Sequence, residues 1–206
     1  MTFRVEKKIV LNQSKVFDLK NWINDNDGSI LYPNRIINSI YFDTNNYSMY
    51  HDSIEGVLPR KKIRLRNYNN LYKFDKNTKK EIKISSSEGR FKTSVIEKNP
   101  LKIMNFGYFD KDYGVCLPVI NIVYERSYYK IKNIRLTLDQ NIYYKKISNS
   151  QISQLSTKDK LNVVELKFSS DKLINSVIKN FPFDVSRFSK YCRGIEFVDS
   201  NYCNDL

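Results

Sequence analysis

The sequence predicts a mainly β fold of the α+β class, an eight-stranded antiparallel barrel with flanking helices. Segments in which apolar and charged residues alternate dominate the chain, and such alternation is typical of half-buried strands. The 15 Tyr and 12 Phe, beside only six Gly and five Pro, suit strands better than loops. Because the 206 residues are 41% hydrophobic and contain no internal repeat or flexible linker, we expect a single domain over residues 1–206.

The predicted strands carry aliphatic side chains on one face and charged side chains on the other. In Lys62–Tyr68, Ile63 and Leu65 oppose Arg64 and Arg66. The strands expected from this pattern are Phe3–Leu11, Ile37–Asp43, Lys62–Tyr68, Lys80–Ser85, Val119–Ile131, Ile134–Ile142 and Val163–Phe168. Roughly eight strands in one compact unit favour a barrel or a strongly curved antiparallel sheet.

Helical patterns are fewer than strand patterns. Ser14 can cap one helix, and Ser169 or Ser170 can cap a second. Weaker helical patterns cover Thr93–Phe106 and Ser148–Lys158. These segments are expected to cover the aliphatic faces of the strands.

Composition restricts the compartment and the kind of site. Three Cys (Cys116, Cys192, Cys203) and one His (His51) show no paired ligand spacing, which argues against a structural zinc site. The scattered cysteines also argue against a disulfide framework. No apolar run approaches the about 18 residues of a membrane span, and the N-terminus lacks a signal-peptide core. We therefore expect a cytoplasmic domain without a membrane span.

The charge balance indicates an anionic partner. Thirty-five Lys and Arg against 22 Asp and Glu give a formal net charge of +13. A surplus of this size favours nucleic acid, a phosphorylated small molecule or a membrane surface as the partner.

The charged strand faces have two interpretations, a solvated outer face over a buried core and a polar lumen with the aliphatic faces turned outward. The second is favoured because most of these faces combine Arg or Lys with one carboxylate and use few Ser, Thr, Asn or Gln. The candidate lumen contains nine cations and four carboxylates: Arg4, Lys8, Arg64, Arg66, Lys83, Arg126, Arg135, Lys167 and Lys190 against Glu6, Glu81, Asp139 and Glu165. Since an eight-stranded barrel has room for one slender ligand, a bound polyanion would relieve this repulsion. Divalent cations bridging carboxylate and phosphate oxygens would explain the carboxylates.

Eight motifs in a fixed order resemble a known family. They are FRVEKKIVL, SIYFDT, RKKIRLRNY, KEIKI, VYERSYY, IRLTLD, VVELKF and FSKYCRGIE, and they cover almost the whole chain. Singly they are weak signals, but the ordered set resembles the VTC catalytic domain, the polyphosphate polymerase branch of the CYTH-like triphosphate tunnel metalloenzymes. The resemblance implies an eight-stranded tunnel that transfers the terminal phosphoryl of ATP to a growing inorganic polyphosphate chain, assisted by Mn²⁺ or Mg²⁺.

The same resemblance implies roles for individual residues. The expected phosphate-binding residues are Lys8, Arg64, Arg66, Lys83, Arg126, Arg135, Lys167, Ser189 and Lys190. Of these, Lys190, Arg64 and Arg66 are expected to act in catalysis with Glu165. Glu165 is the main expected metal ligand, with Glu6 and Glu81 as further acidic positions.

Several alternatives stay open from the sequence. A tunnel-type tripolyphosphatase would use the same residues and hand the phosphoryl group to water. A non-catalytic module that binds polyphosphate or RNA would also be basic and rich in Tyr, but it would not need Glu165 or Glu6. We expect ATP and polyphosphate as partners, no nucleic acid, and a bacterial source, with a membrane-associated export partner left open. Tyr41, Tyr124 and Tyr128 can contact phosphates or a base, although strand tyrosines are more often packing residues.

Overall fold

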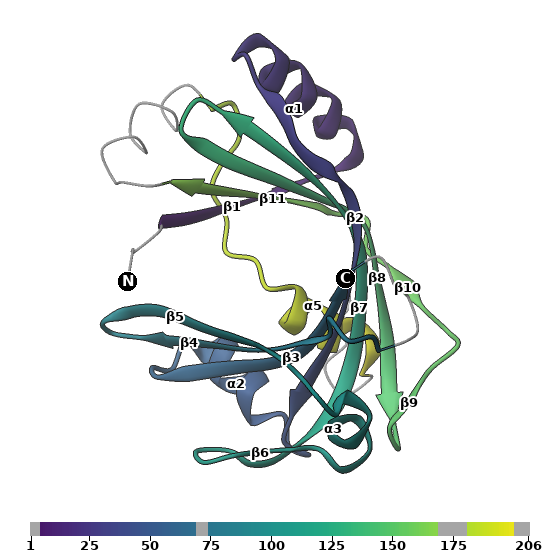
Figure 1. Ribbon diagram of the computed structural model, residues 1–206. Coiled ribbons are helices and arrows are strands. Elements are labelled where there is room, and N and C mark those ends of the chain that lie inside the picture. Colours follow the sequence, from purple (N-terminus) through teal and green to yellow (C-terminus); the bar gives the residue numbers. More distant parts are fainter. Residues whose placement is uncertain (1–4, 69–73, 169–180, 200–206) are drawn as a thin grey trace. The chain divides into compact units, whose positions relative to one another are not determined.

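The computed structural model describes residues 5–68, 74–168 and 181–199 (Figure 1). The chain divides into two compact units, which we describe separately. Unit 1 comprises residues 1–35, 124–142 and 159–188, and unit 2 comprises residues 36–123, 143–158 and 189–206. The division falls inside three long strands, so each of them contributes residues to both units.

The described part of the chain is mainly β, and its strands pair in an antiparallel sheet in the order β1-β11-β8-β7-β2-β3-β4-β5. The strands are β1 (Val5–Leu11), β2 (Ser29–Asp43), β3 (Arg60–Tyr68), β4 (Lys79–Ser86), β5 (Gly89–Ile96), β6 (Tyr108–Asp110), β7 (Gly114–Ile131), β8 (Ile134–Ser148), β9 (Gln151–Ile152), β10 (Thr157–Lys158) and β11 (Asn162–Phe168). The helices are α1 (Gln13–Asp25), α2 (Ser48–Glu55), α3 (Pro100–Phe106) and α5 (Lys190–Val198). The predicted class, an eight-stranded antiparallel fold with flanking helices, is confirmed.

In unit 1, helix α1 covers the aliphatic faces of β1, β11 and β8 (Figure 1). Val16, Leu19 and Ile23 of α1 are buried in one core cluster with aliphatic residues of the three strands. That cluster includes Ile9, Leu11, Ile134, Leu136, Leu138, Val164 and Leu166. Because side chains alternate along a strand, Lys8, Arg135 and Glu165 lie on the opposite face.

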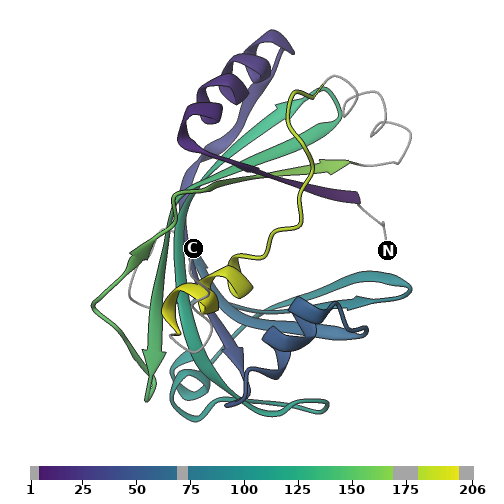
Figure 2. The ribbon, with the colours of Figure 1, turned by 180° about the vertical axis from the view of Figure 1, so that it is seen from behind.

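In unit 2, helices α2 and α3 contribute to the core on the aliphatic faces of β2 and β3. Met49 of α2 and Met104 of α3 are buried with Ile40, Phe42, Ile63 and Leu65. Figure 2 shows α2 beside β3, and the two elements are in contact. Lys62, Arg64 and Arg66 of β3 therefore lie on the face that these helices leave uncovered, whereas Lys61 is on the aliphatic side and pairs with Asp110 at 2.8 Å.

Helix α5 packs against β7 and β8 in unit 2 through a glycine. A Cβ atom on Gly194 would meet Ile120 Cδ1 at 2.6 Å and Tyr144 Cδ1 at 2.7 Å. The helix can approach the strands this closely because residue 194 has no side chain.

Local details differ from the sequence expectations at three of the predicted helices. The cap of α1 is Asn12, whose side chain accepts a hydrogen bond from Lys15 N at 3.0 Å, rather than Ser14. The expected helix at Ser148–Lys158 is wrong, since the segment contains the short strands β9 and β10. The helical pattern at Thr93–Phe106 is correct only for its second half, where α3 lies. The helix expected after Ser169 or Ser170 begins outside the described residues.

Candidate functional site

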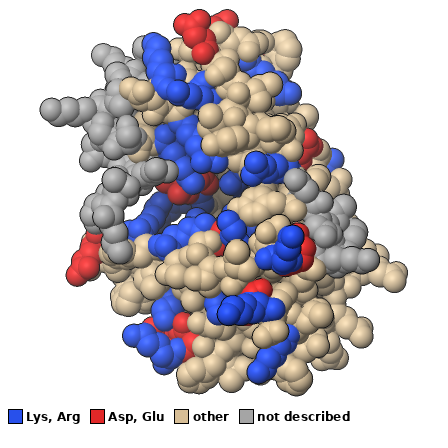
Figure 3. Space-filling model, viewed as in Figure 1, with Lys and Arg blue, Asp and Glu red and all other residues tan. Residues whose placement is uncertain are grey.

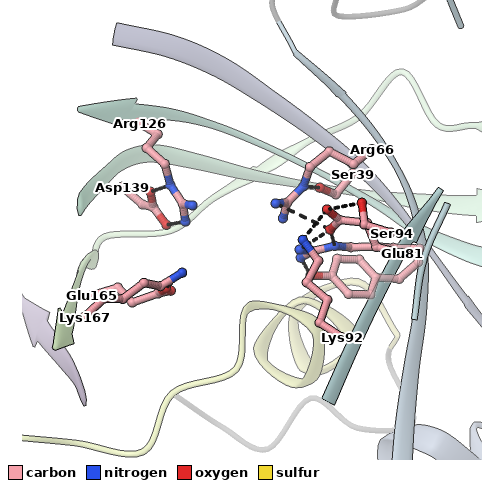
Figure 4. A network of polar contacts seen from close by, with 11 residues as sticks. Ser39, Arg66, Glu81, Lys92, Ser94, Arg126, Asp139, Glu165 and Lys167 are labelled. Atoms are coloured by element: carbon pink, nitrogen blue, oxygen red, sulfur yellow. Dashed lines mark hydrogen bonds and ion pairs between the residues drawn. The ribbon is translucent and has the colours of Figure 1, made fainter. Parts of the chain in front are cut away.

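A single buried carboxylate, Glu81, organises the polar face of unit 2 (Figure 4). It lies on β4 directly opposite Arg64 of β3, because the antiparallel register pairs these two positions. Arg64 Nε donates to Glu81 Oε2 at 2.7 Å, and Arg66 Nη1 lies 3.6 Å from the same oxygen. The other oxygen, Oε1, accepts from Lys92 Nζ and, at 3.4 Å, from Ser94 Oγ of β5.

The electrostatic state of Glu81 follows from these contacts. Burial alone would raise the pKa of its carboxyl, but the charges of Arg64 and Arg66 outweigh burial and hold the pKa well below its usual range. Glu81 is therefore ionised at neutral pH. Its charge holds the two guanidinium groups in fixed positions on the polar face.

The hydroxyl groups of Tyr41 and Ser39 of β2 accept further hydrogen bonds from the guanidinium groups of the two arginines. Arg64 Nη1 donates to Tyr41 Oη at 2.7 Å, and Arg66 Nε donates to Ser39 Oγ at 3.3 Å. Burial opposes ionisation of Tyr41, but the nearby charges of Arg64, Arg66 and Lys83 lower its pKa to about 7. A tyrosine phenol titrating three units below normal indicates a strong positive potential on this face.

Three lysines form a row across the neighbouring register positions of unit 2. Lys62 of β3 pairs with Lys83 of β4, which pairs with Lys92 of β5. Like charges directly opposite each other destabilise a sheet. This row is therefore suited to an anion that bridges the ammonium groups.

Helix α5 begins beside this lysine row. Ser189 caps the helix by accepting from Cys192 N at 3.3 Å, and Lys62 Nζ donates to the same hydroxyl at 2.8 Å. Lys190 is the first residue of the helix. The ring of Tyr191 stacks on Tyr41 with 5.2 Å between centroids, so the start of α5 contacts the residue that holds Arg64.

Asp43 of β2 connects the start of α5 to helix α2. It accepts hydrogen bonds from Met49 N and Tyr50 N of α2 at 2.9 and 3.0 Å, and from the hydroxyl of Tyr191. Burial and the adjacent Asp43 raise the pKa of Tyr191 well above its usual value, so this phenol stays protonated. Asp43 thereby links α2, β2 and α5.

The polar face of unit 1 combines lysines with carboxylates on β1 and β11. In the β1–β11 register Glu6 lies opposite Lys167, and Lys8 lies opposite Glu165. Lys167 Nζ is 2.7 Å from Glu165 Oε1, and Lys8 Nζ donates to the carbonyl oxygen of Phe188 at 2.9 Å. The two carboxylates lie diagonally across one strand pair, on the same face.

Arg126 of β7 and Asp139 of β8 form a forked ion pair in unit 1 (Figure 4). Arg126 Nη2 donates to Asp139 Oδ2 at 2.7 Å, and Nε donates to the other oxygen. Burial would lower the pKa of Arg126, but Asp139 raises it well above its usual value. Arg126 therefore has a buried counterion, Asp139, which forms no ion pair with Arg135 of β8.

The carboxylates differ in how well they suit a divalent metal. Mg²⁺ and Mn²⁺ bind through one or two carboxylates together with substrate phosphates, and Glu165 and Glu6 provide such a pair in unit 1. Both oxygens of Glu81 accept from cationic side chains, which favours an anchoring role for this residue. No group of three or more His, Cys, Asp or Glu suited to a metal occurs among the described residues.

The two polar faces contain all the site residues expected from the sequence. Unit 2 contains Arg64, Arg66, Glu81, Lys83, Ser189 and Lys190, and unit 1 contains Glu6, Lys8, Arg126, Arg135, Glu165 and Lys167. Arg4 lies outside the described residues. Figure 3 shows many Lys and Arg side chains on the side of the molecule that it draws, with Asp and Glu fewer. No helix in the described part of the chain is long and apolar enough to span a membrane.

The alternation in Lys62–Tyr68 places Lys62 on the charged face with Arg64 and Arg66, but Lys62 was not among the expected phosphate-binding residues. Ser39 was missed altogether. Ser39 carries no charge, and only the β2–β3 register brings it to Arg66.

Comparison with solved structures defines the class of fold. A candidate adenylate cyclase from Vibrio parahaemolyticus is similar with a TM-score of 0.54 and 13% identity, over 95% of this chain and 98% of that one. A candidate adenylyl cyclase from Hippeastrum with a dominant triphosphatase activity has a TM-score of 0.56 and 15% identity, over 95% and 97% of the chains. A conserved hypothetical protein from Pyrococcus furiosus has a TM-score of 0.53 and 15% identity, over 92% and 99%. These likenesses show that the chain shares its fold with the three structures.

The family follows from the sequence itself. The chain belongs to the VTC domain family, whose model matches residues 3–199. The resemblance expected from the ordered motifs is thus confirmed over nearly the whole chain. No curated protein matches the sequence.

Proposed function

We propose that this protein is a polyphosphate polymerase, which transfers the terminal phosphoryl group of ATP to inorganic polyphosphate with the help of Mn²⁺ or Mg²⁺. The observation that carries the proposal is the cluster around Glu81 in unit 2. One buried carboxylate fixes two arginines in place, and a lysine row with a surplus of positive charge lies beside them. Membership of the VTC domain family supports the choice of substrate.

Arg64 and Arg66 bind phosphate oxygens in this proposal. Guanidinium groups grip phosphate oxygens in pairs, and the contacts with Glu81, Tyr41 and Ser39 fix their positions before the substrate arrives. Such preorganisation lowers the cost of reorganising the site when charge develops on the transferring group.

Lysines complete the phosphate contacts. Lys83 lies in the register row beside Arg64, and Lys190 is the first residue of α5, which begins beside that row. An ammonium group on a flexible stem acts as a movable point charge, which suits a phosphoryl group that changes position during transfer. Lys8, Arg126, Arg135 and Lys167 are the corresponding candidates in unit 1.

Glu165, with Glu6, would hold the metal ion. The ion would neutralise charge on the donor phosphates and on the transferring oxygens. Lys167 lies 2.7 Å from Glu165, so it holds the carboxylate in place and competes with the metal for it. Phosphate binding by Lys167 would release Glu165 toward the metal.

The direct test incubates the purified protein with ATP and Mn²⁺ and resolves nucleotides and phosphate polymers on a gel. We expect ADP together with phosphate chains that lengthen with time. Orthophosphate without polymer would overturn the polymerase proposal. Neither product, under conditions where the protein binds tripolyphosphate, would show a binding module instead.

A tripolyphosphatase is the second candidate, because the Hippeastrum neighbour has a dominant triphosphatase activity. Both reactions need an acceptor in line with the terminal phosphate, and they differ only in whether that acceptor is polyphosphate or water. Tripolyphosphate offered without ATP separates them. Release of orthophosphate at a rate matching ATP turnover supports the hydrolase.

Two variants separate chemistry from binding. Glu165→Gln removes a carboxylate from a basic face, so we expect metal-free tripolyphosphate to bind as well as to the wild type while turnover falls by orders of magnitude. Lys190→Ala should lose turnover with a smaller loss of affinity, because other cations still hold the chain. Glu125→Gln, which alters a carboxylate on β7 bonded to Asn34, is the matched control and should keep turnover. Metal-dependent turnover unchanged in the first two variants would refute the assigned roles.

A further inference from the structure

Two tyrosines and two arginines form a compact cluster within unit 1. Tyr32 and Arg35 come from β2, Tyr128 from β7 and Arg135 from β8. The tyrosine rings meet edge to face with centroids 5.7 Å apart. Arg35 Cζ lies 5.6 and 5.7 Å from the centroids of Tyr32 and Tyr128, and Arg135 Cζ lies 5.6 and 5.4 Å from them. Both guanidinium groups thus lie against the same pair of rings.

The charge of this cluster is not balanced by carboxylates. Over the described ranges 5–68, 74–168 and 181–199, neither Arg35 nor Arg135 forms an ion pair. Arg126 in the same unit differs from them, because its charge is paired with that of Asp139. Arg135 also has a buried Nε without a hydrogen-bond partner, which is costly in a purely structural arrangement. The cluster therefore has unused capacity for an anionic ligand.

Space for a ligand lies next to Arg135. The residue lines an open pocket of about 350 Å³ at the turn between β7 and β8. The other lining residues are Leu31, Lys130, Lys132, Asn133 and Ile134. The pocket wall includes three cations and no carboxylate, and Arg135 is the residue that the pocket shares with the cluster.

We propose that this cluster binds the nucleobase of a nucleoside triphosphate, with the base stacked on Tyr32 and the guanidinium plane of Arg35, and Arg135 bonded to the adjoining phosphate. The proposal rests on the function proposed above and names the part of the donor that distinguishes ATP from bare tripolyphosphate. It assigns Tyr32 and Arg35, which are not among the expected phosphate-binding residues, to a nucleobase site.

The ring faces favour a base over one more phosphate group. A phosphate gains from guanidinium edges but gains nothing from an aromatic ring, whereas a base stacks on both rings and guanidinium planes. Tyr32 is 43% exposed, so its ring is accessible to a ligand. Arg135 Cζ lies 5.6 Å from the centroid of that ring, so a cation for the phosphates is close to the proposed base.

The test compares ATP with tripolyphosphate by calorimetry in the presence of EDTA, so that no turnover occurs. Tyr32→Leu should weaken ATP binding roughly 5- to 100-fold, the loss expected for one stacked base. Tripolyphosphate affinity should change less than about twofold, since Tyr32 contributes no charge. Tyr32→Phe keeps the ring and should bind ATP like the wild type. Arg35→Lys keeps the positive charge but removes the planar guanidinium group, so it should weaken the binding of ATP more than the binding of tripolyphosphate.

The outcomes separate this inference from the proposed function. If the wild type binds tripolyphosphate and Tyr32→Leu leaves ATP affinity unchanged, the nucleobase site is wrong and the phosphate site stands. An equal loss for both ligands would place Tyr32 at the phosphates and would also overturn the inference. If the wild type binds neither ligand, the proposed function fails and this site fails with it. Unfolding midpoints of all variants identify any that fail to fold, and Tyr32→Phe then decides by whether it retains selectivity for ATP.

Discussion

The polar faces of the two units handle positive charge in different ways. In unit 1, two separate carboxylates each pair with a cation, Asp139 with Arg126 and Glu165 with Lys167. In unit 2, the single carboxylate of Glu81 serves Arg64, Arg66 and Lys92, and Lys92 is itself one end of the lysine row.

This difference suggests a division of labour. A face with surplus cations is ready for phosphates, whose charge replaces the missing counterions. A carboxylate that pairs with one exchangeable lysine, as Glu165 does with Lys167, can exchange that cation for a metal ion. The unit 2 face is therefore the expected phosphate anchor, and the β1–β11 face of unit 1 is the expected place for a metal ion. Four predictions probe this difference.

The largest effect is expected at the shared carboxylate. Glu81→Gln leaves three cations without their common counterion and should lower the free energy of unfolding by about 3–5 kcal/mol. Asp139→Asn leaves only Arg126 without its counterion, so it should lower the free energy of unfolding by less. Chemical denaturation of both variants measures the difference, and tripolyphosphate should restore stability more in Glu81→Gln. A greater loss from Asp139→Asn would contradict the contrast between the two faces.

The second prediction concerns the two sides of β3. Leu65 is 1% exposed in the unit 2 core, so Leu65→Ala should cost about 2–5 kcal/mol of stability. Arg64→Ala removes a phosphate contact and should cost about 1.5–3 kcal/mol of tripolyphosphate binding, because Arg64 makes charge-assisted bonds. Its loss of stability should be smaller than that of Leu65→Ala, since Glu81 keeps Arg66 and Lys92. Chemical denaturation measures the two stability losses, and titration calorimetry measures tripolyphosphate binding. A larger loss of stability in Arg64→Ala than in Leu65→Ala would show that the strand faces are misassigned.

The third prediction uses the ionisation of Tyr41. Its pKa is about 7 in the folded protein and about 10 when unfolded, so between these values the unfolded chain binds more protons. The Tyr41 contribution to stability therefore increases as pH rises from about 7 to 10, and it is lost as pH falls through about 7. A bound phosphate adds negative charge and should raise the Tyr41 pKa, lowering the phenolate absorbance within that window. If the wild type and Tyr41→Phe show the same pH dependence of stability and the same phenolate absorbance, the positive potential of unit 2 is weaker than inferred.

The smallest effect is expected at the more exposed lysines. Lys92 and Lys167 are 42% and 32% exposed at the side chain, so Lys92→Gln and Lys167→Gln should each change stability by less than about 1 kcal/mol. Lys167→Gln should also free Glu165 and increase the apparent affinity for Mn²⁺. A metal titration of the two variants compares the faces directly, since Lys92→Gln should leave Mn²⁺ affinity unchanged.

Much of this arrangement follows from alternation in the sequence. The polar and aliphatic faces of β1, β3, β4, β8 and β11 could be assigned because each strand has a period of two. The partnership of Glu81 with three cations could not, because it depends on the registers of β3 with β4 and of β4 with β5. The alternation shows which face a residue occupies, and the register decides which charges meet.

Helix α2 shows a second limit of the sequence. The residue before it, Tyr47, has a left-handed conformation and provides no side-chain cap. Asp43 accepts hydrogen bonds from Met49 N and Tyr50 N instead, six and seven residues away. A cap at this distance lies outside the spacing that identifies helix starts, so the helix had no recognisable signal. Strand β5 was missed because its residues, apart from Gly89 and Phe91, are exposed and provide little apolar periodicity.

The glycine in α5 has a consequence for how such chains can diverge. Any side chain at position 194 collides with Ile120 and Tyr144, so tolerance there depends on residues more than 45 positions away in the sequence. Gly194→Ala alone should displace the helix that carries Lys190, whereas the same change combined with smaller residues at positions 120 and 144 should be accommodated. Positions 120, 144 and 194 are thus expected to form a permissive set, in which the order of substitutions decides whether the intermediate chain remains functional.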